Sequence, residues 1–120
     1  MDRGRKTTGG KYRKQRKSKL YEYHGFERSA TLGTTKRKQL RMHGGASKTI
    51  LLKENQANIL VGKKIQRTEI INVEATPQNK FLARQNRLMK GAIIETSVGK
   101  ARITNRPSQE GQVNAVLLEK

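Results

Sequence analysis

Beyond residue 46 the chain alternates short aliphatic runs with polar breaks, and the runs are rich in β-branched side chains. The first three runs cover residues 47–52, 57–61 and 68–75. β-Branched side chains fit a pleated, half-buried surface, so short runs of this kind are typical of strands. A polar break at Asn55 and a second at residues 62–64 separate the runs. The pattern therefore predicts three consecutive β-strands.

Apolar and polar residues then alternate over residues 91–105, on either side of a turn region at residues 98–100. A period of two interrupted by a glycine-containing turn predicts a β-hairpin. One more aliphatic run, at residues 112–119, predicts a closing strand.

Three other segments carry weaker patterns. Residues 79–89 have an approximate helical period that includes Phe81, so we expect a helix whose phenylalanine joins the core. Residues 106–111 are expected to form a loop, because Pro107 removes a backbone donor and Gly111 permits a turn. Residues 36–43 alternate loosely and predict an edge strand. The outer face of that edge strand would carry three cations, Arg37, Lys38 and Arg41.

Five or six short strands at close spacing predict a mostly β fold, a small barrel-like or folded antiparallel sheet with one short helix. The first 48 residues contain only three leucines and neither valine nor isoleucine. Such a segment buries too little apolar surface to offset its chain entropy, so it should be extended or disordered when free. We therefore expect residues 1–35 to be an extended basic arm and residues 36–120 to be a small β domain.

Charge identifies the kind of partner. The chain has 27 Lys and Arg against 9 Asp and Glu, a formal net charge of +18. A surface of this charge attracts polyanions. The sequence has no cysteine, which fits a reducing compartment. No aliphatic run approaches the roughly 20 residues of a membrane-spanning helix, and no apolar segment follows the basic start as in a signal peptide. We expect a soluble, cytoplasmic protein with no membrane partner.

Enzymatic motifs fail on inspection. Gly4 and Gly9 have the spacing of a nucleotide-triphosphate loop, but Gly10 stands where that loop needs lysine. Tyr12 then stands where it needs a hydroxyl for magnesium. His24 and His43 are the only histidines and have no carboxylate at ligand spacing. They would have to converge to form a ribonuclease site. The acids of the second part are scattered and should form ordinary surface pairs: Glu54, Glu69, Glu74, Glu95, Glu110 and Glu119. We predict no catalytic activity, metal, cofactor or small-molecule substrate.

Nucleic-acid binding suits the residue types of the arm. Each cation can pair with a phosphate, Gly9 and Gly10 allow close backbone approach, and Thr7 and Thr8 supply hydroxyl donors. Neutralising about eight phosphates would make affinity fall steeply with salt. Four of the five aromatics also lie in the basic segment, namely Tyr12, Tyr21, Tyr23 and Phe26. They could stack on unpaired bases or anchor the arm to its own domain.

RNA is favoured over the other polyanions. The arm has no amphipathic apolar face for a membrane surface. Its glycines would break a long basic helix, and no helix-turn-helix, zinc module or zipper pattern is present. A non-specific or DNA-compacting architectural protein is the alternative, and a nuclease is a third hypothesis. The candidate RNA-binding residues are Arg5, Lys6, Thr7, Thr8, Gly9, Gly10, Lys11, Tyr12, Arg13, Lys14, Arg16, Lys17, Lys19, Arg37, Lys38, Arg41, Lys48 and Arg106.

Three motifs resemble one known family. Arg5-Lys6-Thr7-Thr8-Gly9-Gly10 leads into a Lys/Arg-rich run, His43-Gly44-Gly45 precedes a lysine-containing strand, and residues 106–111 resemble an Arg-Pro-Gly-Gln element. Together they resemble the e-type family eight of small-subunit ribosomal proteins, shared by archaea and eukaryotes. The length resembles the short archaeal form. Two positions depart from the family pattern: the acid-to-glycine spacing after Glu22 is longer, and Ser108 stands where glycine is common.

The resemblance implies a structural component of the small ribosomal subunit. It implies binding to small-subunit ribosomal RNA, with neighbouring ribosomal proteins as further partners. It also implies a β-barrel-like domain with a basic extension and no cofactor.

Overall fold

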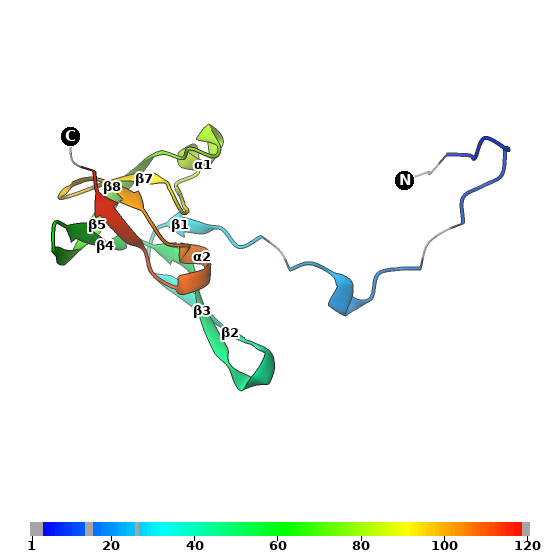
Figure 1. Cartoon of the computed structure of the whole chain (residues 1–120), viewed down its shortest axis with the longest axis horizontal. Coiled ribbons are helices and arrows are strands. Elements are labelled where there is room, and N and C mark those ends of the chain that lie inside the picture. The colour runs from blue at the N-terminus through cyan, green and yellow to red at the C-terminus, as the bar shows by residue number, and fades with distance from the viewer. Residues whose placement is uncertain (1–3, 14–15, 26, 119–120) are drawn as a thin grey trace.

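The computed structural model describes residues 4–13, 16–25 and 27–118 (Figure 1). Strands form two sheets in this described part: a closed barrel in the order β4-β5-β7-β8-β9, and a four-stranded sheet in the order β2-β3-β1-β6. The strands are β1 (Ala30–Leu32), β2 (Lys36–Arg41), β3 (Ser47–Glu54), β4 (Gln56–Val61), β5 (Lys64–Ala75), β6 (Arg87–Leu88), β7 (Ile93–Thr96), β8 (Gly99–Ile103) and β9 (Asn114–Leu117). The helices are α1 (Lys80–Arg84) and α2 (Pro107–Glu110), with 3-10 turns η1 (Leu20–Glu22) and η2 (His43–Gly45).

The barrel closes where β4 pairs in parallel with β9, its last strand. Residues that point inward are small or aliphatic, as period-two alternation requires. In β4, Ala57 and Ile59 are buried, while Asn58 and Leu60, which alternate with them, are not. The same core includes Val73, Ile94, Ala101, Ile103 and Ala115. Closure leaves the barrel without a free sheet edge.

The second sheet extends away from the barrel. β2 and β3 form an antiparallel hairpin that projects from the domain and ends in η2 (Figure 1). β2 is an edge strand, as residues 36–43 predicted. The predicted outer face is wrong in one detail. The register pairs Arg37 with Leu51 but Lys38 with Ile50, so the two cations lie on opposite faces of the hairpin.

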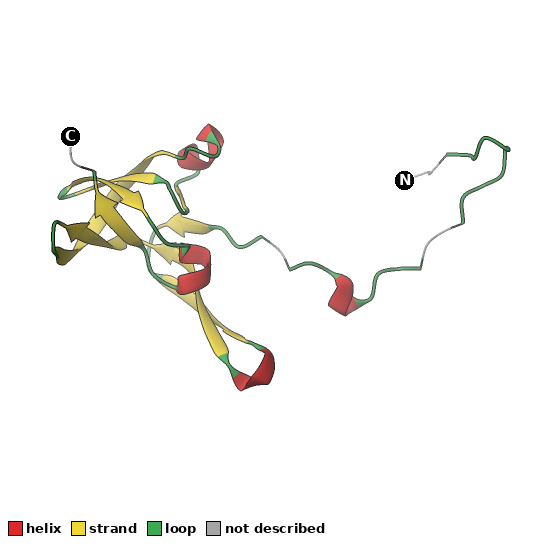
Figure 2. Cartoon of the chain, in the orientation of Figure 1, coloured by secondary structure: helices red, strands yellow, loops and turns green. Residues whose placement is uncertain are grey.

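Most of the predicted strands are confirmed. β3, β4 and β5 contain the predicted residues 47–52, 57–61 and 68–75 and extend beyond them, β5 as far back as Lys64 in the expected polar break. β7 and β8 form the predicted hairpin. The closing strand is shorter than expected. The described residues contain nine strands: the six expected beyond residue 46, the edge strand β2, and two more, β1 and β6, which are too short to leave a sequence signal. The mostly β fold is visible in Figure 2, where the arm is mainly loop.

Two predictions of secondary structure are wrong. The helix expected over 79–89 ends at Arg84, because Asn86 adopts a left-handed φ of 51° and the chain then pairs with β1 as β6. The loop expected over 106–111 contains α2. Pro107 suits the first turn of a helix, where its missing N–H has no partner to lose, and Gly111 at φ 72° ends the helix.

Two predicted side-chain environments are also wrong. Phe81 is 65% exposed and does not join the core. Glu54, expected on the surface, is 2% exposed at the end of β3, where the chain passes from one sheet to the other. Its carboxylate accepts hydrogen bonds from Thr35 Oγ1 at 2.6 Å and Arg37 Nη2 at 2.8 Å. These two donors compensate a charge that would otherwise be costly to bury.

The N-terminal segment runs away from the two sheets as an extended chain (Figure 1). The whole described structure measures 67 × 37 × 24 Å, and the arm accounts for the long dimension. The segment joins the domain at β1, where Ala30 is 2% exposed. Within residues 1–35, β1 is therefore part of the second sheet.

Candidate nucleic-acid interface

The glycine-containing motif of the arm forms a tight turn. Gly9 N–H donates to the Lys6 carbonyl at 2.8 Å, and Lys6 N–H donates to the Gly10 carbonyl at 2.9 Å. Arg5 and Lys11 face each other as an isolated antiparallel bridge. Gly9 has a φ of 80°, in the left-handed region that favours glycine. The turn therefore places Arg5, Lys6 and Lys11 close together at its base.

Gly10, unlike Gly9, has a backbone conformation that other residues can adopt. Its backbone lies outside the left-handed region, and an added Cβ would meet only Thr8 Oγ1, at an ordinary 3.7 Å. The described structure thus gives no internal reason for glycine at position 10. Of the two glycines, the backbone conformation requires Gly9 but not Gly10.

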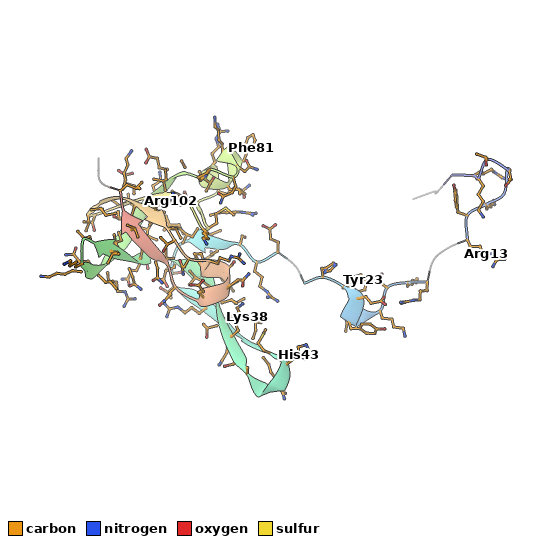
Figure 3. All side chains as sticks on the ribbon, in the orientation of Figure 1. Arg13, Tyr23, Lys38, His43, Phe81 and Arg102 are labelled. Atoms are coloured by element: carbon orange, nitrogen blue, oxygen red, sulfur yellow. The ribbon has the colours of Figure 1, made fainter. Side chains whose placement is uncertain are left out.

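The arm's tyrosines contact cations and solvent. Lys6 Nζ lies over the Tyr12 ring, 5.7 Å from its centroid, and Lys19 Nζ lies 5.9 Å from that of Tyr21. Tyr12, Tyr21 and Tyr23 are each more than half exposed. Figure 3 shows Tyr23 and Arg13 well away from the domain. These three rings do not anchor the arm to its own domain; Phe26 lies outside the described residues.

Within the arm, the predicted RNA-binding residue Arg16 is already paired with an acid. The Arg16 guanidinium binds both carboxylate oxygens of Glu22, with Arg16 Nη1 and Glu22 Oε2 2.9 Å apart. The backbone N–H of Lys19 donates to the same carboxylate at 2.9 Å. These bonds lower the pKa of Glu22, chiefly through Arg16, and raise the pKa of Arg16. Spacing of six residues gave no sequence signal for this pair.

The candidate residues of the domain lie around the β2–β3 hairpin. Arg37 is engaged by Glu54, and Lys48 Nζ donates to Gln109 Oε1 of α2 at 3.1 Å. Arg106 is the exposed N-cap residue of α2. Lys38 and Arg41 are exposed on β2, and Figure 3 shows Lys38 and His43 along the projecting hairpin.

A groove of about 430 Å³ separates this hairpin from α2 and β6. Its floor is apolar and includes Leu40 and Ile50, and three cations line it, Arg28, Lys48 and Arg87. Nothing in the local sequence distinguishes Arg28 and Arg87 from other surface cations, because only the pairing of β6 with β1 brings them beside the hairpin.

The remaining candidates of the arm are exposed wherever the structure describes them; Lys14 lies outside the described residues. The structure brings Arg5, Lys6 and Lys11 together but does not bring the arm's cations to those of the hairpin. Within the described part, no three His, Cys, Asp or Glu residues gather as metal ligands. Nor does any helix there have the length and apolar character to cross a membrane.

The fold and its charge define a class of protein: a small closed β-barrel that carries a long cationic arm. Residues 2–118 match the family model described as Ribosomal protein S8e. The chain belongs to that family, as its motifs suggested.

Curated relatives are similar along nearly their whole length. The chain is 39% identical over 115 residues to small ribosomal subunit protein eS8 of Halorubrum lacusprofundi, covering 96% of this chain and 94% of the relative. It is 40% identical over 117 residues to that of Methanocorpusculum labreanum, with the same coverage. Identity to that of Methanococcus aeolicus is 43% over 121 residues, covering 95% and 91%.

The Arg16–Glu22 pair predicts a measurable titration. Because the pKa of Glu22 is lowered, the pair is intact above that pKa and is lost as pH falls through it. Side-chain carboxyl NMR of the full chain should show Glu22 titrating below the ordinary range of a glutamate, about 4.3. In the control variant Arg16→Gln the midpoint should rise. An identical midpoint in both proteins would show that the pair does not form in solution.

Proposed function

We propose that this chain is a structural component of the small ribosomal subunit and binds its ribosomal RNA through the arm and the β2–β3 hairpin. The observation that carries the proposal is the arm itself, whose cations and tyrosines are exposed on an extended chain. The relatives, each called small ribosomal subunit protein eS8, support the assignment to that subunit. The role is structural, and no catalytic step is assigned to His24 or His43.

The arm and the barrel are suited to different parts of the task. An extended polypeptide is much narrower than a folded domain, so it can enter spaces between RNA helices that the domain cannot. Its Lys and Arg side chains would neutralise phosphates there and release counterions. The tyrosines would supply flat surfaces on which unpaired bases stack. The four-stranded sheet would hold one end of the arm at β1 and present the β2–β3 hairpin as a second contact.

Close approach of the backbone is assigned to Gly10. At Gly9 the left-handed turn already requires glycine, whereas at Gly10 only an outside partner would be obstructed by a side chain. A phosphate resting against the turn would also meet Arg5, Lys6 and Lys11, which the bridge holds nearby.

Deleting residues 1–19 should weaken binding to small-subunit RNA and flatten its salt dependence. If the arm neutralises about eight phosphates, the slope of log affinity against log salt should fall by about 6. Filter binding from low to physiological salt measures it, with duplex DNA as the competing ligand. An unchanged slope would move the binding surface to the β domain, and equal affinity for both ligands would favour the non-specific architectural alternative.

Substituting Gly10→Ala should weaken RNA binding about ten-fold, because the methyl group would hold a phosphate away from the turn. The free protein should keep its turn, since the backbone and the space at Gly10 both accept alanine. Gly9→Ala is the matched comparison, and it should also shift the amide signals of the free turn. Wild-type affinity in Gly10→Ala would mean that the backbone does not approach the RNA there.

A further inference from the structure

Phe81 is the one aromatic residue after the arm, and it lies on the surface. It is 65% exposed on α1, and Figure 3 shows it at the outer end of the domain. A phenylalanine is usually among the more buried residues of a small protein. Its position at the surface therefore calls for a reason other than packing.

The local structure fixes Phe81 outward. The Asn79 side chain accepts the Phe81 N–H at 2.9 Å and so begins the helix. α1 then rests on the domain through Ala83, which is 8% exposed and belongs to the core. The short helix buries alanine and leaves phenylalanine free, the reverse of what burial of apolar area would favour.

Two cations of α1 lie near the exposed Phe81 ring or next to it in the chain. The guanidinium of Arg84 lies over the Phe81 ring, 5.6 Å from its centroid, and Lys80 is exposed next to it. Lys80 and Arg84 also line a groove of about 800 Å³ on another side of the helix, and Phe81 does not line it. The acid in that lining, Glu74, is paired with Lys100.

We propose that Phe81 and Arg84 form a stacking platform for an unpaired base of the RNA. The base stacks on the exposed part of the ring, and Lys80 and Arg84 pair with the phosphates on either side of it. This inference rests on the proposed RNA-binding function and gives the barrel domain a contact of its own, distant from the hairpin.

A base fits these surroundings better than a pocket in a neighbouring protein. An apolar pocket that received Phe81 would also strip water from Lys80 and Arg84, which is costly without acidic partners. RNA supplies both a flat apolar face and the negative charge. The platform residues therefore match one ligand class in both respects.

The test compares variants of the full chain in binding to small-subunit RNA across a salt series. Phe81→Leu should weaken binding about ten-fold at every salt concentration and leave the slope unchanged, because stacking releases no counterions. Phe81→Tyr, which keeps a ring, should bind like the wild type. Arg84→Gln should flatten the slope by about 0.7 to 0.9, the loss of one phosphate contact. Thermal unfolding of Phe81→Leu should match the wild type, because the ring is exposed.

Wild-type affinity in Phe81→Leu would overturn the proposal. So would a variant that binds RNA normally but fails to enter assembled subunits, since that outcome assigns Phe81 to a protein neighbour. The arm is tested separately. A Phe81→Leu defect that persists after deletion of residues 1–19 supports the platform even if the deletion itself leaves the salt slope unchanged.

Discussion

The parallel pairing of β4 with β9 joins the two ends of the barrel, and the arrangement of the rest of the domain depends on it. The register sets Asn58 opposite Asn114, and their side-chain amides are hydrogen-bonded at 3.1 Å. A closed barrel of this size has an interior that alanine, valine and isoleucine fill. No aromatic ring is needed inside, so every aromatic whose position is described lies outward.

This constraint explains how so basic a chain can fold and still offer charge to a partner. The core is confined to aliphatic side chains. Cations are carried on the arm, the hairpin and α1, and on the outer face of the barrel strands β5 and β8, where Lys64, Arg67, Lys100 and Arg102 are exposed. Where a charge is drawn inward, as at Glu54, an arginine and a hydroxyl compensate it. Self-repulsion among the remaining cations destabilises the free protein, and a polyanion would relieve it. The separation of an aliphatic core from cations on the surface thus accounts for both the fold and the proposed binding of RNA.

Much of the fold could be predicted from local sequence, and each prediction that was wrong has an identifiable physical cause. β3, β4 and β5 are long enough to be predicted from their content of β-branched residues. β6 is two residues long and exists only because β1 lies beside it, which no local pattern reveals. Pro107 and Gly111 are as compatible with a loop as with a helix, and here they begin and end α2. Phe81 followed a helical period, but the period could not show which face of a five-residue helix would be buried.

Some features of the candidate site could likewise be predicted from the sequence, and others could not. The density of cations in residues 5–19 is a property of the sequence, and the structure leaves most of them exposed. The acid with which a given cation pairs cannot be predicted from the sequence, because the Arg16–Glu22 and Arg37–Glu54 pairs span six and 17 residues. The difference between Gly9 and Gly10 could not be predicted either, since the two glycines are identical in sequence and differ only in backbone conformation and surrounding space.

Ultraviolet crosslinking of the assembled small subunit, with mass spectrometry of the crosslinked peptides, tests the central claim most directly. The account predicts RNA crosslinks at Tyr12, Tyr21 and Tyr23 of the arm, because exposed aromatic rings that stack on bases are favourably placed to react. Crosslinks confined to the barrel, with the arm attached to proteins or to nothing, would contradict it.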